Sequence, residues 1–67
     1  MTNNPIRVVV AEDHAGVRAG ICTMLDHAAD IVVVGEASDG IEALNLVDEL
    51  SPDVLLLDVE MPRLSGR

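Results

Sequence analysis

The chain has 67 residues, and nearly half of them are apolar, so it is large enough for one small domain only. Twelve acidic residues outweigh four arginines, and with no lysine present the formal net charge is −8. A chain with this charge repels nucleic acids and anionic membranes, which are bound by clustered Lys and Arg side chains. The absence of aromatic residues excludes surfaces on which the bases of a nucleic acid stack.

The first predicted element is a strand over the aliphatic run from Ile6 to Ala11. A short continuous run of β-branched residues is typical of a strand buried on both faces of a parallel sheet. A helix is expected next, because apolar residues recur at helical spacing and form a single stripe: Val17, Ile21, Met24, Leu25 and Ala28.

A second strand is expected over Ile31 to Val34, followed by a second helix. Asp39 is the expected N-cap of this helix, and Glu42 lies three residues further on, as in a capping box. Pro52 is expected to end the helix because proline has no backbone N–H to donate. The third strand is expected over Val54 to Leu57, and the apolar face of the second helix is predicted to contain Ala43, Leu44, Val47 and Leu50.

The order strand, helix, strand, helix, strand predicts an α/β fold with a doubly wound parallel sheet. Crossovers between parallel strands are right-handed and place the helices over the sheet. Residues 1–67 are interpreted as one incomplete domain that is truncated after the third strand. In such sheets, functional residues gather beyond the carboxyl ends of the strands, where the strand order reverses.

Acidic residues follow two of the three predicted strands. Glu12 and Asp13 come after the first strand, and Asp58 comes after the third. If the first strand lies between the other two, the three carboxylates share one pocket, and their mutual repulsion favours a hard cation such as Mg²⁺. A carboxylate is the nucleophile in aspartyl-phosphate chemistry, so Asp58 is the candidate acceptor of a phosphoryl group.

Three segments strengthen this interpretation: VVVAEDH, VVGEASDGIEAL and PDVLLLDVEMPRLSG. In order and spacing they resemble the first three strand regions of response-regulator receiver domains, which are CheY-like and flavodoxin-like in fold. The resemblance implies a phosphoryl group transferred from a histidine kinase to Asp58 in a two-component phosphorelay. It also implies that Glu12, Asp13 and Asp58 hold Mg²⁺, with the backbone carbonyl of Glu60 as a further ligand.

The resemblance also shows what the sequence lacks. In the family, a fourth strand ends in Ser or Thr and a fifth ends in a Lys that pairs with the phosphoryl group, whereas this chain contains no lysine. We therefore expect phosphorylation of the chain itself to be weak or absent. The third strand, Val54 to Leu57, is expected to be an exposed apolar edge, which predicts self-association into a homo-oligomer.

The receiver interpretation makes the chain a phospho-acceptor module and not an enzyme with a separate substrate. One alternative is a structural or interaction fragment that folds by self-association and performs no phosphoryl chemistry. A phosphohydrolase with an aspartate nucleophile fits less well. Such enzymes usually carry the nucleophilic Asp on the first strand, with a second acid two residues later. Here Asp58 and Glu60 follow the third strand, and the first strand ends in Glu12 and Asp13.

A cytoplasmic location without contact to nucleic acid or membrane is expected for this segment. The single Cys22 excludes an internal disulfide, the N-terminus lacks signal-peptide features, and no apolar run reaches the length of a membrane span. Cys22 is interpreted as a buried or half-buried apolar residue. His14 and His27 are expected at the start and the end of the first helix, and Mg²⁺ disfavours imidazole as a ligand.

Overall fold

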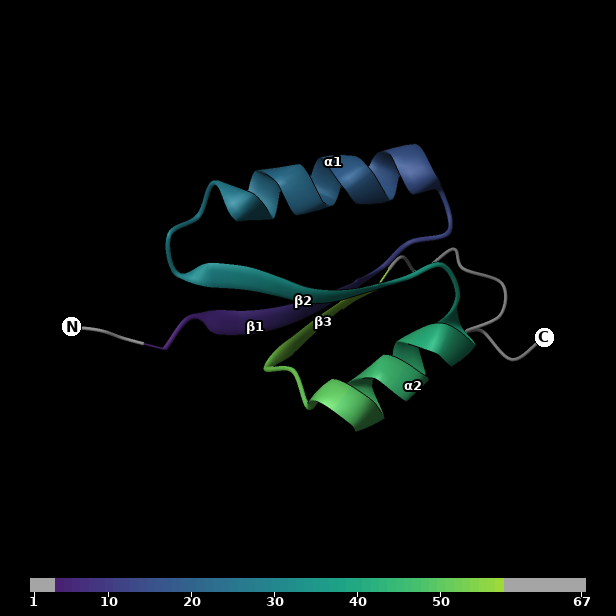
Figure 1. Cartoon of the computed structure of the whole chain (residues 1–67). Helices are drawn as coiled ribbons and strands as arrows, with labels where there is room; N and C mark the ends of the chain where they lie inside the picture. Colours follow the sequence, from purple (N-terminus) through teal and green to yellow (C-terminus); the bar gives the residue numbers. More distant parts are fainter. Residues whose placement is uncertain (1–3, 58–67) are drawn as a thin grey trace.

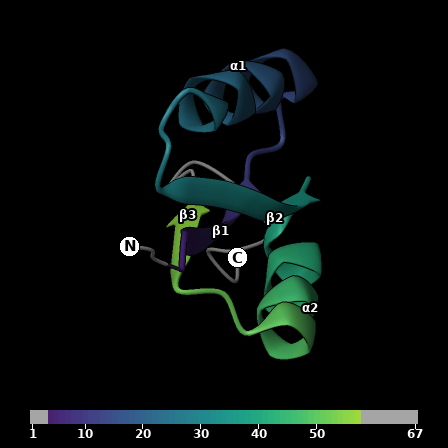
Figure 2. The ribbon, with the colours of Figure 1, turned by 60° about the vertical axis from the view of Figure 1, so that its left-hand side comes forward.

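The computed structural model describes residues 4–57, which form one sheet with a helix on each face (Figure 1). The turned view agrees that the two helices lie on opposite sides of the sheet (Figure 2). This arrangement confirms the predicted doubly wound α/β fold. In chain order the elements are β1 (Ile6–Ala11), α1 (Ala15–Asp26), β2 (Ile31–Ala37), α2 (Gly40–Leu50) and β3 (Val54–Leu57).

The sheet is parallel, with the strand order β2-β1-β3, so β1 is the central strand. Its residues Val8 to Ala11 are buried, and Val9 and Val10 are the largest side chains that are fully buried among the described residues. β3 pairs with β1 alone within the described part of the chain, and Val54 at its start is 40% exposed. The expectation of burial therefore holds for Val8 to Ala11 of β1, and β3 is mostly exposed, as expected of an apolar edge strand.

β2 extends three residues beyond its predicted end, to Ala37. The apolar run is broken in the sequence by Gly35 and Glu36, but the backbone continues to pair with β1. The register shifts between Val8 and Val9, which leaves Val34 as the extra residue of a bulge. A Cβ atom on Gly35 would lie 3.1 Å from a Leu50 methyl group, so the glycine lets α2 approach the sheet closely.

The start of α2 confirms the predicted cap. The Asp39 carboxylate accepts a hydrogen bond of 2.8 Å from the backbone N–H of Glu42. The Glu42 carboxylate accepts bonds from the backbone N–H and the hydroxyl of Ser38, at 2.7 and 3.0 Å, so it reaches one residue further back than in a standard capping box. The helix ends at Leu50, before Pro52, as expected.

Replacing Asp39 with Ala is expected to lower the free energy of unfolding by about 1 kcal/mol, because the N–H of Glu42 loses its acceptor. Asp48→Ala, an exposed substitution within the same helix, is the control and is expected to have little effect. Urea unfolding followed by circular dichroism measures both, since the chain has no Trp or Tyr fluorescence. Equal stability of the two variants would contradict the role of the cap.

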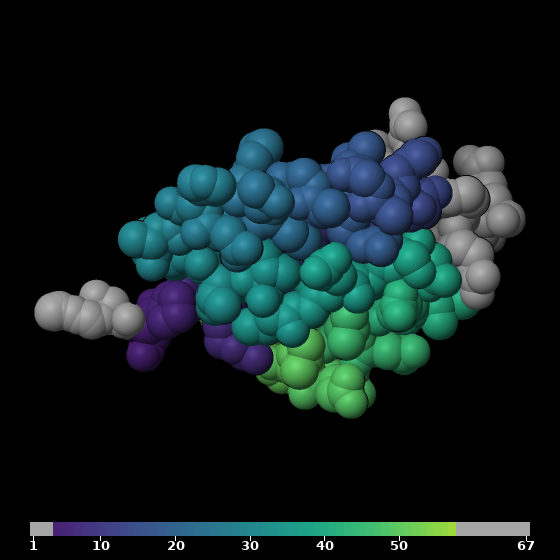
Figure 3. Space-filling model, turned by 45° about the horizontal axis from the view of Figure 1, so that its top comes forward, coloured from purple at the N-terminus to yellow at the C-terminus, as the bar shows by residue number. Residues whose placement is uncertain are grey.

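The predicted apolar stripe of the first helix is only partly correct. α1 ends at Asp26, so Ala28 lies outside it, and no residue of the helix is fully buried. Met24 is 72% exposed, and Val17 is also largely exposed. The space-filling view shows β2 at the surface beside α1 (Figure 3). The helix therefore covers the sheet with a narrower face than its sequence predicts.

The end of the sheet opposite the acidic residues is closed by the segment between α2 and β3. The backbone N–H of Arg7 donates to the Asp53 carboxylate at 2.9 Å, and the N–H of Asp53 donates to the carbonyl of Arg7 at 2.8 Å. The Arg7 guanidinium also donates to the carbonyl of Ser51 at 2.9 Å. Ser51 has a left-handed backbone with φ 48° just before Pro52, so this contact fixes the turn that starts β3.

Candidate acidic site at the carboxyl end of the sheet

The carboxyl ends of all three strands meet at one edge of the sheet. Ala11, the last residue of β1, pairs with Ala37 of β2 and with Leu57 of β3. Glu12 follows directly, and its backbone N–H donates to the carbonyl of Ala37 at 3.0 Å. The predicted strand order is therefore confirmed, and it brings the first acidic residue to the point where the order of the strands reverses.

Glu12 is the one buried charged residue in the described part of the chain, with 5% of its surface exposed. Burying a carboxylate is unfavourable unless its oxygens accept hydrogen bonds. One oxygen of Glu12 accepts from the backbone N–H of His14 at 3.0 Å and lies 2.8 Å from the His14 Nδ1 atom. The short turn between β1 and α1 thus folds back to partner its own buried acid.

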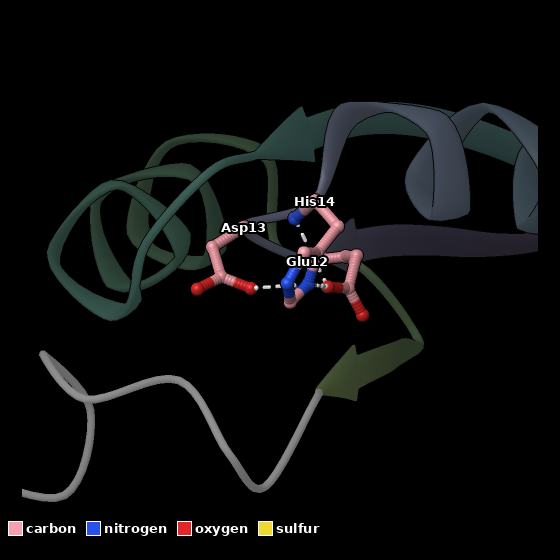
Figure 4. A group of neighbouring side chains, drawn as sticks. All are labelled: Glu12, Asp13 and His14. Atoms are coloured by element: carbon pink, nitrogen blue, oxygen red, sulfur yellow. Dashed lines mark hydrogen bonds and ion pairs between the residues drawn. The ribbon is translucent and has the colours of Figure 1, made fainter.

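Asp13 lies beside Glu12 but is more exposed to solvent. The imidazole of His14 sits between the two carboxylates, with Nδ1 at 3.0 Å from an Asp13 oxygen and 2.8 Å from a Glu12 oxygen (Figure 4). The ligand atoms that these three side chains offer lie within 4.8 Å of one another. The structure therefore brings the two predicted acids together. It also adds His14, which was expected at the helix start but not in contact with the two acids.

A cavity of about 410 Å³ opens beside Glu12, between α1 and the ends of β1 and β3. Its described lining is apolar except for Glu12 and consists of Val10, Ala11, Glu12, Ile21, Leu56 and Leu57. Leu57 is the last described residue. The predicted site residues Asp58 and Glu60 lie outside the described residues, so their roles stay predictions.

Arg18 is a site residue that the sequence interpretation missed. Its guanidinium donates to the backbone carbonyl of Glu12 at 2.8 Å and also contacts the Glu36 carboxylate at 3.3 Å. A signal was present in the sequence, because Arg18 lies four residues after His14 and therefore on the same side of the helix start.

Comparison with known proteins agrees with this geometry. The family model of the response regulator receiver domain matches residues 8–67. The chain belongs to the response-regulator receiver family. The signal receiver domain of the putative response regulator NarL from Mycobacterium tuberculosis superposes with a TM-score of 0.86 at 45% identity, covering 90% of this chain and 48% of that one. The receiver fold and its strand order are therefore shared with a solved structure.

Two curated relatives carry receivers within larger proteins. The transcriptional regulatory protein LiaR of Bacillus subtilis is 49% identical over 61 residues, which are 91% of this chain and 29% of LiaR. A protein-glutamate methylesterase/protein-glutamine glutaminase of Methanospirillum hungatei is 51% identical over 61 residues, 18% of its length. The chain thus spans less than a third of either relative. The enzyme name belongs to a whole protein, and the part that matches here is its receiver, a signalling module.

The donor set of the receiver's acidic pair fits a hard divalent cation. Carboxylate oxygens are the ligands that Mg²⁺ prefers, and Glu12 and Asp13 offer them from adjacent positions. The imidazole nitrogen of His14 is a poorer donor for Mg²⁺ and lies between the two carboxylates. The His14 side chain is 68% exposed, whereas that of Glu12 is only 6% exposed.

Cys22, on α1, is half-buried, as predicted. Partial burial raises the pKa of its thiol, and the nearby Glu36 and Asp26 carboxylates raise it further, while Arg18 acts in the opposite direction. A raised pKa leaves less thiolate at neutral pH, which agrees with a packing role and not a reactive one.

Between residues 4 and 57, neither helix has the length and apolar character that a membrane crossing requires.

Proposed function

We propose that this receiver accepts a phosphoryl group on Asp58 from a histidine kinase, in the cytoplasm, with Mg²⁺ held by Glu12, Asp13 and Asp58 and by the backbone carbonyl of Glu60. The observation that supports the proposal most is the pairing of Ala11 with Leu57. Asp58 is bonded to Leu57, as Glu12 is to Ala11, so both acids are expected at the same edge of the sheet. The receiver family match covers both positions.

In the proposed reaction, a carboxylate oxygen of Asp58 attacks the phosphorus atom, and the bond from phosphorus to the nitrogen of the donor histidine breaks. Mg²⁺, when bound, neutralises charge on the phosphoryl oxygens. Glu12 and Asp13 keep the ion beside the acceptor, next to a cavity whose described lining is apolar apart from Glu12. The sequence contains no lysine to pair with the phosphoryl group, so the 67-residue chain is expected to be phosphorylated only weakly.

The test is intact mass spectrometry after incubation with a small-molecule phosphodonor. It is applied to the chain and to any longer protein that carries it, with and without Mg²⁺. A single phosphoryl adduct that depends on Mg²⁺ supports the proposal. The absence of an adduct on the longer protein would contradict it.

A second candidate function is an interaction module that associates with itself, and the exposure of β3 favours it. Val54, Leu56 and Leu57 are all exposed apolar residues on a strand that pairs on one side only within residues 4–57. An apolar strand with unpaired backbone groups is a template for pairing with another chain. An unchanged melting temperature on addition of Mg²⁺ would favour this candidate, because an ion that binds the folded state raises it.

The wild-type chain is therefore expected to form dimers or larger species at micromolar concentration, as measured by light scattering. Val54→Lys places a charge on the exposed edge of β3 and is expected to shift the population towards monomer. The matched control is Leu44→Lys on α2, where the replaced side chain is 59% exposed. A wild-type chain that is wholly monomeric would rule out this association.

A further inference from the structure

The Arg18 side chain connects three elements at the acidic site. It extends from α1, donates through its terminal nitrogen to the carbonyl of Glu12 at 2.8 Å, and contacts Glu36 of β2 through Nε at 3.3 Å. Only 21% of the side chain is exposed, so its position is set by packing as well as by these bonds. Its positive charge is offset by the Glu36 carboxylate.

The carbonyl that Arg18 contacts belongs to the peptide group between Glu12 and Asp13. A peptide group is planar, so fixing its oxygen fixes the direction in which the chain leaves towards Asp13. The preceding N–H, that of Glu12, is fixed as well, because it donates to the carbonyl of Ala37 at 3.0 Å. Both backbone hydrogen-bonding groups of Glu12 are therefore held, one by β2 and one by α1.

We propose that Arg18 is a positioning residue for the divalent cation, which it never contacts. By orienting the peptide group between Glu12 and Asp13, it sets the relative direction of the two carboxylates. The inference rests on the proposed function only in taking this pair as the Mg²⁺ site. Outer groups that hold ligands in place are a general source of metal affinity.

The positive charge of Arg18 allows its positioning role to be told apart from a purely electrostatic one by the direction in which Mg²⁺ affinity changes. A guanidinium close to a cation site repels the cation, so a role through charge alone predicts that its removal tightens Mg²⁺ binding. A positioning role predicts the reverse, because the carboxylates lose their common orientation. The two explanations are therefore separated by the direction of the change in affinity as well as by its size.

The experiment is isothermal titration calorimetry of the full chain with MgCl₂. Arg18→Gln is expected to weaken Mg²⁺ binding by about tenfold, the low end of the effect of outer-shell partners. Arg18→Lys keeps the charge but replaces the two-donor fork with one ammonium group, so it is expected to weaken binding as well. Circular dichroism of each variant gives its folded fraction, and the measured Mg²⁺ affinity is corrected for that fraction. If Arg18→Gln does not fold, Arg18→Lys is the variant on which the inference is tested.

Arg7→Gln is the matched control. Arg7 also donates to a backbone carbonyl, that of Ser51, but it lies at the other end of β1. Glu12 is five positions further along the chain, about 16 Å away at the usual rise per residue of a strand. Removing this charge is expected to change Mg²⁺ affinity by less than about twofold, because the charge lies beyond the Debye length at physiological salt.

Unchanged or tighter Mg²⁺ binding in both Arg18 variants, with the wild type binding the ion, would overturn the inference and leave the proposed function intact. Weaker binding in the Arg7 variant to the same extent would also overturn it, because the effect would then be general destabilisation. No Mg²⁺ binding by the wild type would contradict the proposed function and the inference together.

Discussion

Replacing Asp58 with Asn is expected to abolish the phosphoryl adduct completely. The amide of Asn has the size of the carboxylate but no anionic oxygen to attack phosphorus, so no acyl phosphate is formed. The measurement is intact mass after incubation with a phosphodonor and Mg²⁺, made on whichever form of the protein shows an adduct in the wild type. The expected result is a mass spectrum without any phosphoryl adduct, and this result does not depend on protein stability as long as the variant folds.

The matched control for this substitution is Asp48→Asn. Asp48 lies on α2 and is exposed, so the same carboxylate-to-amide change is made away from the carboxyl end of the sheet. The control is expected to keep the full adduct. An adduct that survives Asp58→Asn and is lost in another aspartate variant would show that the acceptor has been assigned to the wrong residue.

Replacing Glu12 with Gln is expected to weaken Mg²⁺ binding by more than about tenfold, because the effect of losing a ligand exceeds that of losing an outer-shell partner. Glu12 is buried directly after β1, and its carboxylate and that of Asp13 form the anionic pair of the site. Titration calorimetry with MgCl₂ measures the affinity. Glu49→Gln, an exposed substitution on α2 with the same change in charge, is the control.

Stability in the absence of Mg²⁺ separates loss of a ligand from loss of the fold. A buried amide costs less free energy than a buried carboxylate, so Glu12→Gln is not expected to lower the free energy of unfolding. Mg²⁺ is expected to raise the melting temperature of the wild type more than that of the Glu12 variant. Equal Mg²⁺ affinity in the Glu12 and Glu49 variants would exclude Glu12 as a ligand.

Two strand boundaries were predictable because composition changes sharply at them. β1 ends where Ala11 gives way to Glu12, and β3 begins where Asp53 gives way to Val54, as the sequence indicates. The end of β2 was not predictable in this way. Gly35 and Glu36 interrupt the apolar run, and only pairing with β1 keeps the backbone extended as far as Ala37.

The helices show the same division between local and tertiary causes. The cap at Asp39 depends on residues within four positions of one another, so the sequence alone predicts it. The buried face of α1 depends on how the helix lies across a sheet of three strands, which leaves Met24 exposed although its spacing matches the apolar stripe. Periodicity states which residues share a side of a helix, and packing decides how much of that side is covered.

At the site, adjacency in the sequence was enough to predict that Glu12 and Asp13 lie together. Their meeting with the end of β3 needed the strand order, which the sequence interpretation took as a condition and the structure confirms as far as Leu57. The spacing from His14 places Arg18 on the side of the helix start, but its bond to the Glu12 carbonyl also depends on the angle at which α1 leaves the turn, which the sequence does not give.

The central position of β1 also affects how the chain folds during translation. Its residues Val9 and Val10 are the largest fully buried side chains in the described part of the molecule, yet β1 is synthesised before both of its partners. β2 begins at Ile31 and β3 at Val54, 25 and 48 residues after the start of β1 at Ile6. At about 5–20 residues per second, these partners leave the ribosome roughly 1–5 s and 2–10 s later. For that interval the aliphatic side chains of β1 have neither partner strand to pack against, so the sheet forms only after the rest of the described chain has been made.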